Sequence, residues 1–232
     1  MQVEEGRGGS ATVEEAYSKF LERFPLAFKI WKQLGVLYQS KQDFRQAEAT
    51  YHRCLDACRN VQLWLDYLQM LRSTMLEKVN RQDEKQYNLA RQSFESALER
   101  AITNVGMAPD SYPLWRAYID FVKEFPELNT ADPARRVQSL RKVYQRAICV
   151  PSHDLDTLWR EYESLERSAG ELLAERVLPE FRERNAHAKA IFKERERLTS
   201  MLALDRLALP PTNQTSGSFE AQQLDTWNKW IR

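Results

Sequence analysis

The chain has 232 residues, enough for one compact domain or one linear array of repeats. Its 34 lysines and arginines nearly balance 33 aspartates and glutamates, and a net charge of +1 gives no general attraction to nucleic acids or other polyanions. With 43% hydrophobic residues, six tryptophans and only seven glycines, the composition excludes a disordered chain and indicates an almost entirely helical protein.

Three cysteines without paired spacing argue against a disulfide framework and favour a reducing compartment. The first ten residues lack the basic and apolar regions of a secretory signal. No run of 18 apolar residues occurs, so no membrane span is predicted. We therefore expect an intracellular protein of the cytosol or the nucleus.

In chain order, residues 1–9 are predicted to be a disordered tail, and the first helix is predicted to begin at Ser10, or at Thr12 with Glu15 completing a capping box. Residues 10–209 are predicted to form a helical-repeat array of about five repeats, the first one partial. The array is indicated by two patterns that alternate along the chain.

The first pattern pairs a tryptophan with a large apolar residue three positions later, which places both side chains on one face of a helix. We call the helices with this pattern A helices. The pairs are Trp31/Leu34, Trp64/Tyr67, Trp115/Tyr118, Trp159/Tyr162 and Trp227/Trp230.

The second pattern, which defines the B helices, has a small residue, a ring or large side chain four positions later, and another small residue after three more. Such a face lets a neighbouring helix approach closely while the large side chains fill the remaining gap. The side chains expected in the core with the A-helix rings are Ala47 and Tyr51, Ala90, Phe94 and Ala97, and Tyr144 and Ala147.

A long charged helix is predicted after the fourth A helix, from about Gly170 to Leu209, and Pro179 either starts it or kinks it. Its alternating charges suit internal ion pairs rather than a phosphate-binding track. Residues 210–218 are predicted to form a loop, and residues 219–232 the first helix of a further, truncated repeat.

Candidate chemical sites are few. Cys54, Cys58 and His52 lack a fourth ligand and a zinc-type spacing, and Cys54 occupies a small packing position. His153 and Asp154 have no nucleophile beside them, and Ser152 or Asp154 is expected to cap the next helix. Because no phosphate-binding loop, dinucleotide fingerprint or catalytic motif occurs, we predict no catalytic residues, no cofactor and no metal, and thus not an enzyme.

One helix is strongly basic, with no acidic residue between Asp132 and Asp154. It is either a solvated face, a surface for an acidic protein partner, or a direct RNA contact. The basic side chains are Arg135, Arg136, Arg141, Lys142 and Arg146.

The A and B helices together resemble the half-a-tetratricopeptide (HAT) repeat, which is typical of RNA-processing assemblies. The segments YHRCLDACRNVQLWLDYLQMLR (51–72), KVYQRAICVPSHDLDTLWREYESLE (142–166) and PPTNQTSGSFEAQQLDTWNKWI (210–231) are similar to the suppressor-of-forked family, the HAT-repeat scaffold subunits of cleavage stimulation factor. The similarity runs from about residue 12 to the end and covers the N-terminal HAT half of that family. Departures are Leu34 in place of an aromatic residue and Pro179 within the long helix.

The resemblance implies an all-α solenoid of antiparallel helix pairs wound into a right-handed superhelix, in a nuclear scaffold for pre-mRNA cleavage and polyadenylation. The partners it implies are an RNA-recognition subunit, a WD-repeat subunit and the cleavage and polyadenylation specificity factor, with pre-mRNA contacted mostly indirectly. It also implies a homodimer formed through a C-terminal half absent here, so we expect this chain alone to be largely monomeric. The alternatives are a HAT scaffold of splicing or ribosome biogenesis, or an RNA-binding module that uses the basic helix 135–146.

Overall fold

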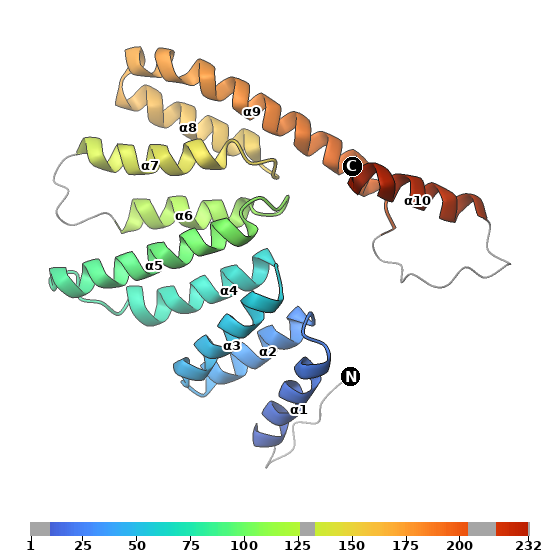
Figure 1. Ribbon diagram of the computed structural model, residues 1–232. Helices are drawn as coiled ribbons and strands as arrows, with labels where there is room; N and C mark the ends of the chain where they lie inside the picture. Colours follow the sequence, from blue (N-terminus) through green and yellow to red (C-terminus); the bar gives the residue numbers. More distant parts are fainter. Residues whose placement is uncertain (1–9, 126–132, 204–216, 232) are drawn as a thin grey trace. The chain divides into compact units, whose positions relative to one another are not determined.

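The structure is a computed structural model that describes residues 10–125, 133–203 and 217–231, and this part of the chain forms ten α-helices and one π-helix (Figure 1). The helices are α1 (Ser10–Arg23), α2 (Phe28–Ser40), α3 (Phe44–Ala57), α4 (Val61–Leu71), the π-helix η1 (Arg72–Leu76), α5 (Glu84–Val105), α6 (Tyr112–Glu124), α7 (Pro133–Ala147), α8 (Leu155–Ala169), α9 (Glu171–Ser200) and α10 (Gly217–Ile231).

The chain divides into two compact units, residues 1–143 and 144–232, and the boundary lies inside α7. The sequence predicted a single array over residues 10–209 and gave no sign of this division. The predicted tail 1–9 and residues 210–216 of the predicted loop lie outside the described residues. The last helix begins at Gly217, two residues before the predicted start at Phe219.

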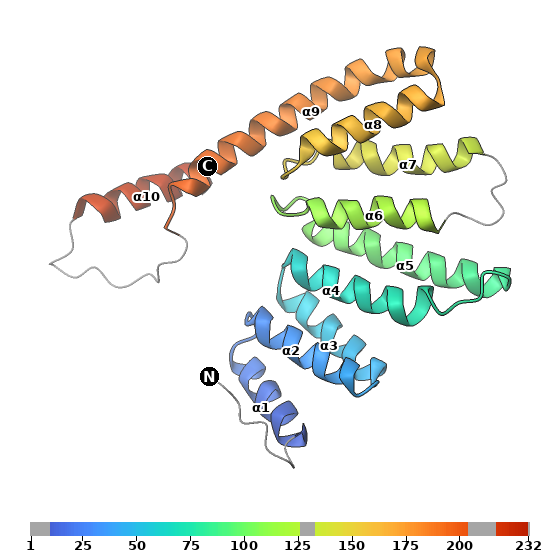
Figure 2. The same cartoon turned by 180° about the vertical axis from the view of Figure 1, so that it is seen from behind.

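In the first unit the two sequence patterns fall on alternate helices. The A-helix tryptophans lie on α2, α4 and α6, and the B pattern lies on α3 and α5. Helices that follow one another in the chain pack together (Figures 1 and 2). Helix α4 also contacts α6. Neighbouring A helices therefore form a continuous layer of the first unit, as repeat packing requires.

Polar caps explain where several of these helices begin. The side chain of Asp43 accepts a hydrogen bond from the backbone N–H of Gln46 at 3.1 Å, and Asp83 accepts one from Gln86 at 3.1 Å. Asn60 does the same for the N–H of Leu63 at 3.2 Å. Each cap satisfies a donor that the first turn of a helix would otherwise leave unpaired.

The π-helix η1 continues α4 and was not predicted. The N–H of Glu77 donates to the carbonyl of Arg72 at 2.9 Å, a bond over five residues, and the Thr74 hydroxyl donates to the Met70 carbonyl at 2.7 Å. The wider turn ends at Leu76, whose side chain is buried. An apolar residue at that point of the chain is thus placed in the core without breaking the helix.

A glycine allows α2 and α3 to approach closely. A Cβ atom added at Gly35 would lie 3.1 Å from Cζ of Tyr51, closer than side chains normally pack. Tyr51 is itself fixed, because Gln39 donates a hydrogen bond to its hydroxyl at 3.1 Å and its ring lies 5.7 Å from that of Tyr67. The pairing of α2 with α3 therefore depends on a residue without a side chain at position 35.

In the second unit a single residue, Gly170, joins α8 to α9, and its φ of 157° is a backbone conformation that other residues rarely adopt. Pro179 lies inside α9 and does not start it, which removes one of the two predicted possibilities. The helix ends at Ser200, before the predicted end at Leu209. The amide of Asn185 ties α9 to the chain after α7 by donating to the Ile148 carbonyl at 2.8 Å.

Within the described ranges, no helix combines the length and the apolar character that crossing a bilayer requires.

Candidate protein-interaction surface

A groove of about 300 Å³ lies in the layer of A helices, between α4 and α6. The buried side chains of Leu68 and Phe94 contribute to its lining, together with Leu65 and Ala117. Its polar lining comes from α4 and η1. We call this groove, lined by Gln62, Leu65, Asp66, Leu68, Gln69, Arg72, Phe94 and Ala117, the A-helix groove.

The charged groups of the A-helix groove are already paired. Lys32 of α2 lies 2.9 Å from Asp66, and Arg72 donates to Glu77 at 2.9 Å and also pairs with Glu124 of α6. The pairs Lys32–Asp66 and Arg72–Glu124 connect neighbouring helices, and all three pairs are partly exposed, so each contributes little to stability. The pairs matter more for binding, because they leave the groove without a concentrated positive charge that would attract a phosphate backbone.

The A-helix groove is therefore suited to a protein segment. The exposed amide of Gln69 can donate and accept hydrogen bonds, as a peptide backbone requires, and Gln62, which already donates to Asp66 at 3.1 Å, keeps its amide oxygen as an acceptor. The apolar lining can take an aliphatic side chain. The spacing of seven residues places both amides on one face of α4, two turns apart.

A second, shallower hollow of about 530 Å³ is lined by α5 and α6 and is acidic. Its polar lining consists of Gln92, Glu95, Ser96 and Glu99 from successive turns of α5, with Tyr118 from α6. The Tyr118 hydroxyl donates to Glu99 at 2.7 Å, and Arg91 pairs with Glu95 at 3.0 Å. The lining of this hollow contains no cation, which disfavours nucleic acid there.

The structure places most of the predicted core side chains in the interior. Tyr118 and Tyr162 point their rings inward and use their hydroxyls for hydrogen bonds at the edge of the core. The buried side chains from the predicted set are Trp31, Trp64, Tyr67, Trp115, Tyr118, Tyr162, Tyr51, Phe94, Tyr144, Ala47, Ala90, Ala97 and Ala147.

Two residues that were predicted to lie in the core are not fully buried. Trp159 is only half-buried, and the Arg182 guanidinium lies 5.9 Å from the centre of its ring. Trp227 is 39% exposed, so its assignment to the core is wrong. The cause is local: α10 packs on the end of α9 through a face that buries Thr226 and leaves the tryptophans outside that contact.

The predicted basic helix is α7, and its basic side chains differ in exposure. Arg136, Lys142 and Arg146 are exposed, whereas Arg141 is half-buried. Arg141 and Arg146 both interact with other groups of the chain. The side chain of Arg135 lies outside the described residues.

Two of the cysteines are used in packing. The Cys54 thiol donates to the Tyr51 carbonyl at 3.2 Å, and the Cys58 thiol donates to the Pro25 carbonyl at 3.3 Å. Burial, followed by the proximity of Cys58, raises the pKa of Cys54 to about 12, which keeps it a thiol. In the described part of the chain, no three His, Cys, Asp or Glu side chains come together as a metal site would require.

The turn before α8 also differs from its prediction. Asp154 occupies the capping position with a φ of 57°, but its side chain makes no capping hydrogen bond. The Ser152 hydroxyl donates to the His153 carbonyl at 3.4 Å instead. The His153 ring contacts Phe192 of α9, with ring centres 4.7 Å apart, so this histidine takes part in packing.

Sequence reasoning missed the groove residues Gln62, Asp66 and Gln69. A signal was present, because these polar residues recur every three or four positions on the side of α4 away from Trp64 and Tyr67. The pattern does not reveal that α6 lies beside this face, which is a property of the tertiary structure.

Comparison with known proteins identifies the family. The model of the family described as suppressor of forked protein (Suf) matches residues 1–232. The chain belongs to the suppressor-of-forked family. This result confirms the resemblance drawn from the HAT-like segments.

Relatives of this suppressor-of-forked chain carry names from one process. The mRNA 3′-end-processing protein rna-14 of Neurospora crassa is 33% identical over the whole chain, which covers 20% of that protein. Cleavage stimulation factor subunit 77 of Arabidopsis thaliana is 28% identical over 93% of the chain and 28% of its own length. The rna14 protein of Schizosaccharomyces pombe is 29% identical, with 97% of the chain and 29% of that protein covered. The chain thus spans less than a third of the length of these relatives.

A crystal structure titled CstF-77 matches the fold with a TM-score of 0.59 and 18% identity, over 88% of this chain and 43% of that one. The prediction of an all-α helical-repeat fold is confirmed by this match.

Proposed function

We propose that this suppressor-of-forked chain is part of a non-catalytic nuclear scaffold for pre-mRNA 3′-end cleavage and polyadenylation. The observation that carries the proposal is the family match over residues 1–232, supported by relatives named for mRNA 3′-end processing and for cleavage stimulation factor. The helical repeats supply extended surfaces, and the paired charges of the A-helix groove favour protein partners over RNA.

The partners proposed for the whole protein are the RNA-recognition and WD-repeat subunits of cleavage stimulation factor and the cleavage and polyadenylation specificity factor. Pre-mRNA is contacted mostly through these subunits. Within this chain, we assign the A-helix groove as a contact for an extended protein segment, because it combines exposed amides with an apolar lining.

The function is tested by purifying the tagged full-length protein from nuclear extract and identifying the bound proteins by mass spectrometry. Cleavage and polyadenylation factors are expected. Recovery of spliceosomal or pre-ribosomal proteins in their place would overturn the proposed process and leave the fold unaffected.

The A-helix groove is tested in the same purification with Gln62→Arg and Gln69→Arg combined. The two added cations should lower the recovery of at least one processing factor severalfold. The matched control changes two exposed glutamines elsewhere, Gln46→Arg and Gln82→Arg, and should leave recovery unchanged. Equal recovery with both double variants would remove the groove from the proposal without affecting the process.

We also expect the 232-residue chain alone to be monomeric, since the resemblance places dimerisation in a separate half of the protein. Light scattering at micromolar concentration should give a mass near 27.3 kDa. A mass of about twice that value would contradict the expectation.

A further inference from the structure

The end of α9 carries an arrangement of residues that the scaffold role does not use. Arg195 and Arg197 stand five and three positions before Ser200, and the apolar Met201 follows it. Arginines at these two positions, with an apolar residue after the acceptor, are what arginine-directed serine/threonine kinases recognise, because acidic groups in the kinase cleft pair with the guanidinium groups.

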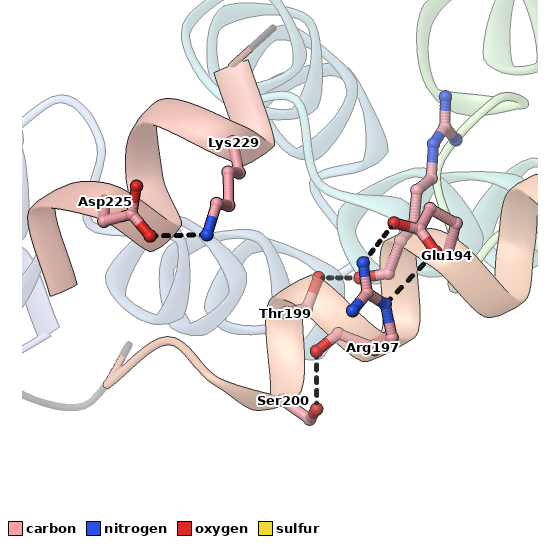
Figure 3. Close-up of polar contacts among 7 residues, drawn as sticks. Glu194, Arg197, Thr199, Ser200, Asp225 and Lys229 are labelled. Atoms are coloured by element: carbon pink, nitrogen blue, oxygen red, sulfur yellow. Dashed lines mark hydrogen bonds and ion pairs between the residues drawn. The ribbon is translucent and has the colours of Figure 1, made fainter. Parts of the chain in front are cut away.

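This part of α9 is accessible. Ser200, Arg195, Arg197 and Met201 are all exposed, and beyond Ala188 no residue of α9 is buried. The Ser200 hydroxyl donates only within its own turn, to the Arg197 carbonyl at 2.9 Å, and Thr199 bonds to the Arg195 carbonyl in the same way (Figure 3). A kinase binds its substrate in an extended form, and opening an exposed helix end requires little free energy.

The side-chain ion pair that opening would break is weak. Arg197 pairs with Glu194 at 2.6 Å, but both side chains are more than half exposed (Figure 3). Such a pair contributes little to stability in water. The arginine is therefore free to exchange Glu194 for a carboxylate of a kinase.

The same helix end is held by α10. The side chain of Gln223 accepts a hydrogen bond from the Ala203 N–H at 3.0 Å and donates one to the Met201 carbonyl at 2.9 Å. These two bonds, which we call the Gln223 clamp, begin one residue after Ser200. A change at Ser200 therefore reaches the α9–α10 junction directly.

We propose that Ser200 is a phosphorylation site for an arginine-directed kinase and that its phosphate loosens the Gln223 clamp. In the transfer, Oγ of Ser200 bonds to the γ-phosphorus of Mg-ATP, and the bond from that phosphorus to the β–γ bridging oxygen breaks. ADP leaves, and the hydroxyl proton passes to a base of the kinase. The products are phosphoserine and ADP.

The phosphate acts against the helix end for three reasons. The hydroxyl can no longer donate to the Arg197 carbonyl. A charge near −2 then sits at the negative end of the helix dipole. Glu196, one turn earlier, adds like-charge repulsion. Arg197 can pair with the phosphate and oppose these effects only if its ion pair with Glu194 breaks.

Modification is tested on the full 232-residue chain with the catalytic domain of protein kinase B and Mg-ATP, followed by phosphosite mapping. Phosphate is expected on Ser200 and is lost in Ser200→Ala. Arg197→Ala should slow the reaction at least about tenfold, since it removes a charge-assisted pair. Ser168 is the matched control: it is exposed near the end of α8 and donates to Leu165 three residues back, but Glu163 and Leu165 replace the two arginines. Phosphorylation of Ser168 at the same rate as Ser200, or no phosphate on Ser200, would overturn the assignment.

The effect on the clamp is tested by hydrogen exchange. The amides of Leu202 and Ala203 should exchange roughly two- to fivefold faster in the phosphorylated chain. Gln223→Ala, which removes the clamp without phosphate, should give an acceleration of the same kind at Ala203. Unchanged exchange at both amides in the phosphorylated chain, with acceleration in Gln223→Ala, would show that the phosphate does not loosen the junction.

Discussion

Trp115 and Trp227 occupy equivalent positions in the sequence pattern but contribute differently to stability. Trp115 is 2% exposed and donates its indole N–H to the Gly106 carbonyl at 3.0 Å, whereas Trp227 is 39% exposed. Replacing Trp115 by Ala should lower the free energy of unfolding by about 3–5 kcal/mol, because it leaves a cavity and an unpaired carbonyl. Trp227→Ala should cost less than about 1.5 kcal/mol. Urea unfolding of both variants gives the comparison, and equal losses would contradict it.

Three buried groups with raised pKa values, Tyr51, Tyr67 and Cys54, predict how the free energy of unfolding depends on pH. Burial, with a smaller effect of Asp66, raises the pKa of Tyr51 to about 12, and burial, with a smaller effect of Glu48, raises the pKa of Tyr67 to about 12. The pKa of Cys54 is also raised to about 12. In the unfolded chain these groups lose their protons near pH 10 for tyrosine and about 8.5 for cysteine.

Between those values and about pH 12 the unfolded chain therefore binds fewer protons than the folded chain. The free energy of unfolding should be constant with respect to these groups below about pH 8 and fall as the pH rises toward 12. Urea titrations from pH 8 to pH 11 measure the fall. Tyr67→Phe removes one of the groups and should flatten the curve; an unchanged slope in this variant would contradict the assignment of Tyr67.

At the scale of elements, Asn185 holds the middle of α9. Its side chain is 3% exposed and donates to the Ile148 carbonyl at 2.8 Å. Asn185→Ala leaves that carbonyl without its donor and should lower the stability of the second unit by about 1–3 kcal/mol. Hydrogen exchange in α8 and α9 reports the change for this unit.

Asn104 is a matched control for Asn185. Its amide also donates to a carbonyl at 2.8 Å, but the acceptor is Arg100 one turn earlier on the exposed side of α5. Asn104→Ala should change stability by less than about 0.5 kcal/mol. A loss of stability as large as that of Asn185→Ala would mean that burial does not determine how much such a hydrogen bond contributes to stability.

Most helices could be predicted because their signals are local. The alternation of A and B patterns and the start of α1 at Ser10 follow from neighbouring residues. The π-turn at Arg72–Leu76 and the course of α9 through Pro179 could not be predicted. Both involve side chains that are buried in the tertiary structure, Leu76 at the end of the turn and Leu178 beside the proline.

The candidate surface was less predictable than the fold. Residues facing inward repeat in type, so the positions of Trp64 and Tyr67 could be inferred from sequence. The lining of the A-helix groove includes Gln62, Gln69 and Leu65, which have no common chemistry and become a site only because α6 lies beside α4. For the same reason Trp227 was misassigned, since its pattern says nothing about how much of α10 is covered.

At the scale of the whole molecule, the charge balance favours a protein scaffold over an RNA-binding module. The chain has a net charge of +1, and many of its arginines and lysines are paired with carboxylates, as in Lys32–Asp66, Arg167–Glu163 and Arg184–Glu180. A cation that is already paired with a carboxylate releases few counterions from a nucleic acid, so electrostatic attraction contributes little to the affinity for RNA.

Binding of an unstructured RNA to the 232-residue chain should therefore be weak, with a Kd above about 0.1 mM at physiological salt. A fluorescence titration at several salt concentrations measures both the affinity and its salt dependence. Arg136→Glu combined with Lys142→Glu removes two exposed cations of α7 and should change the weak binding little. If the unmodified chain binds RNA in the micromolar range, with a steep salt dependence that this double variant abolishes, α7 is an RNA contact. In that case the chain would bind RNA through α7, and the A-helix groove between α4 and α6 would be only one of its binding surfaces.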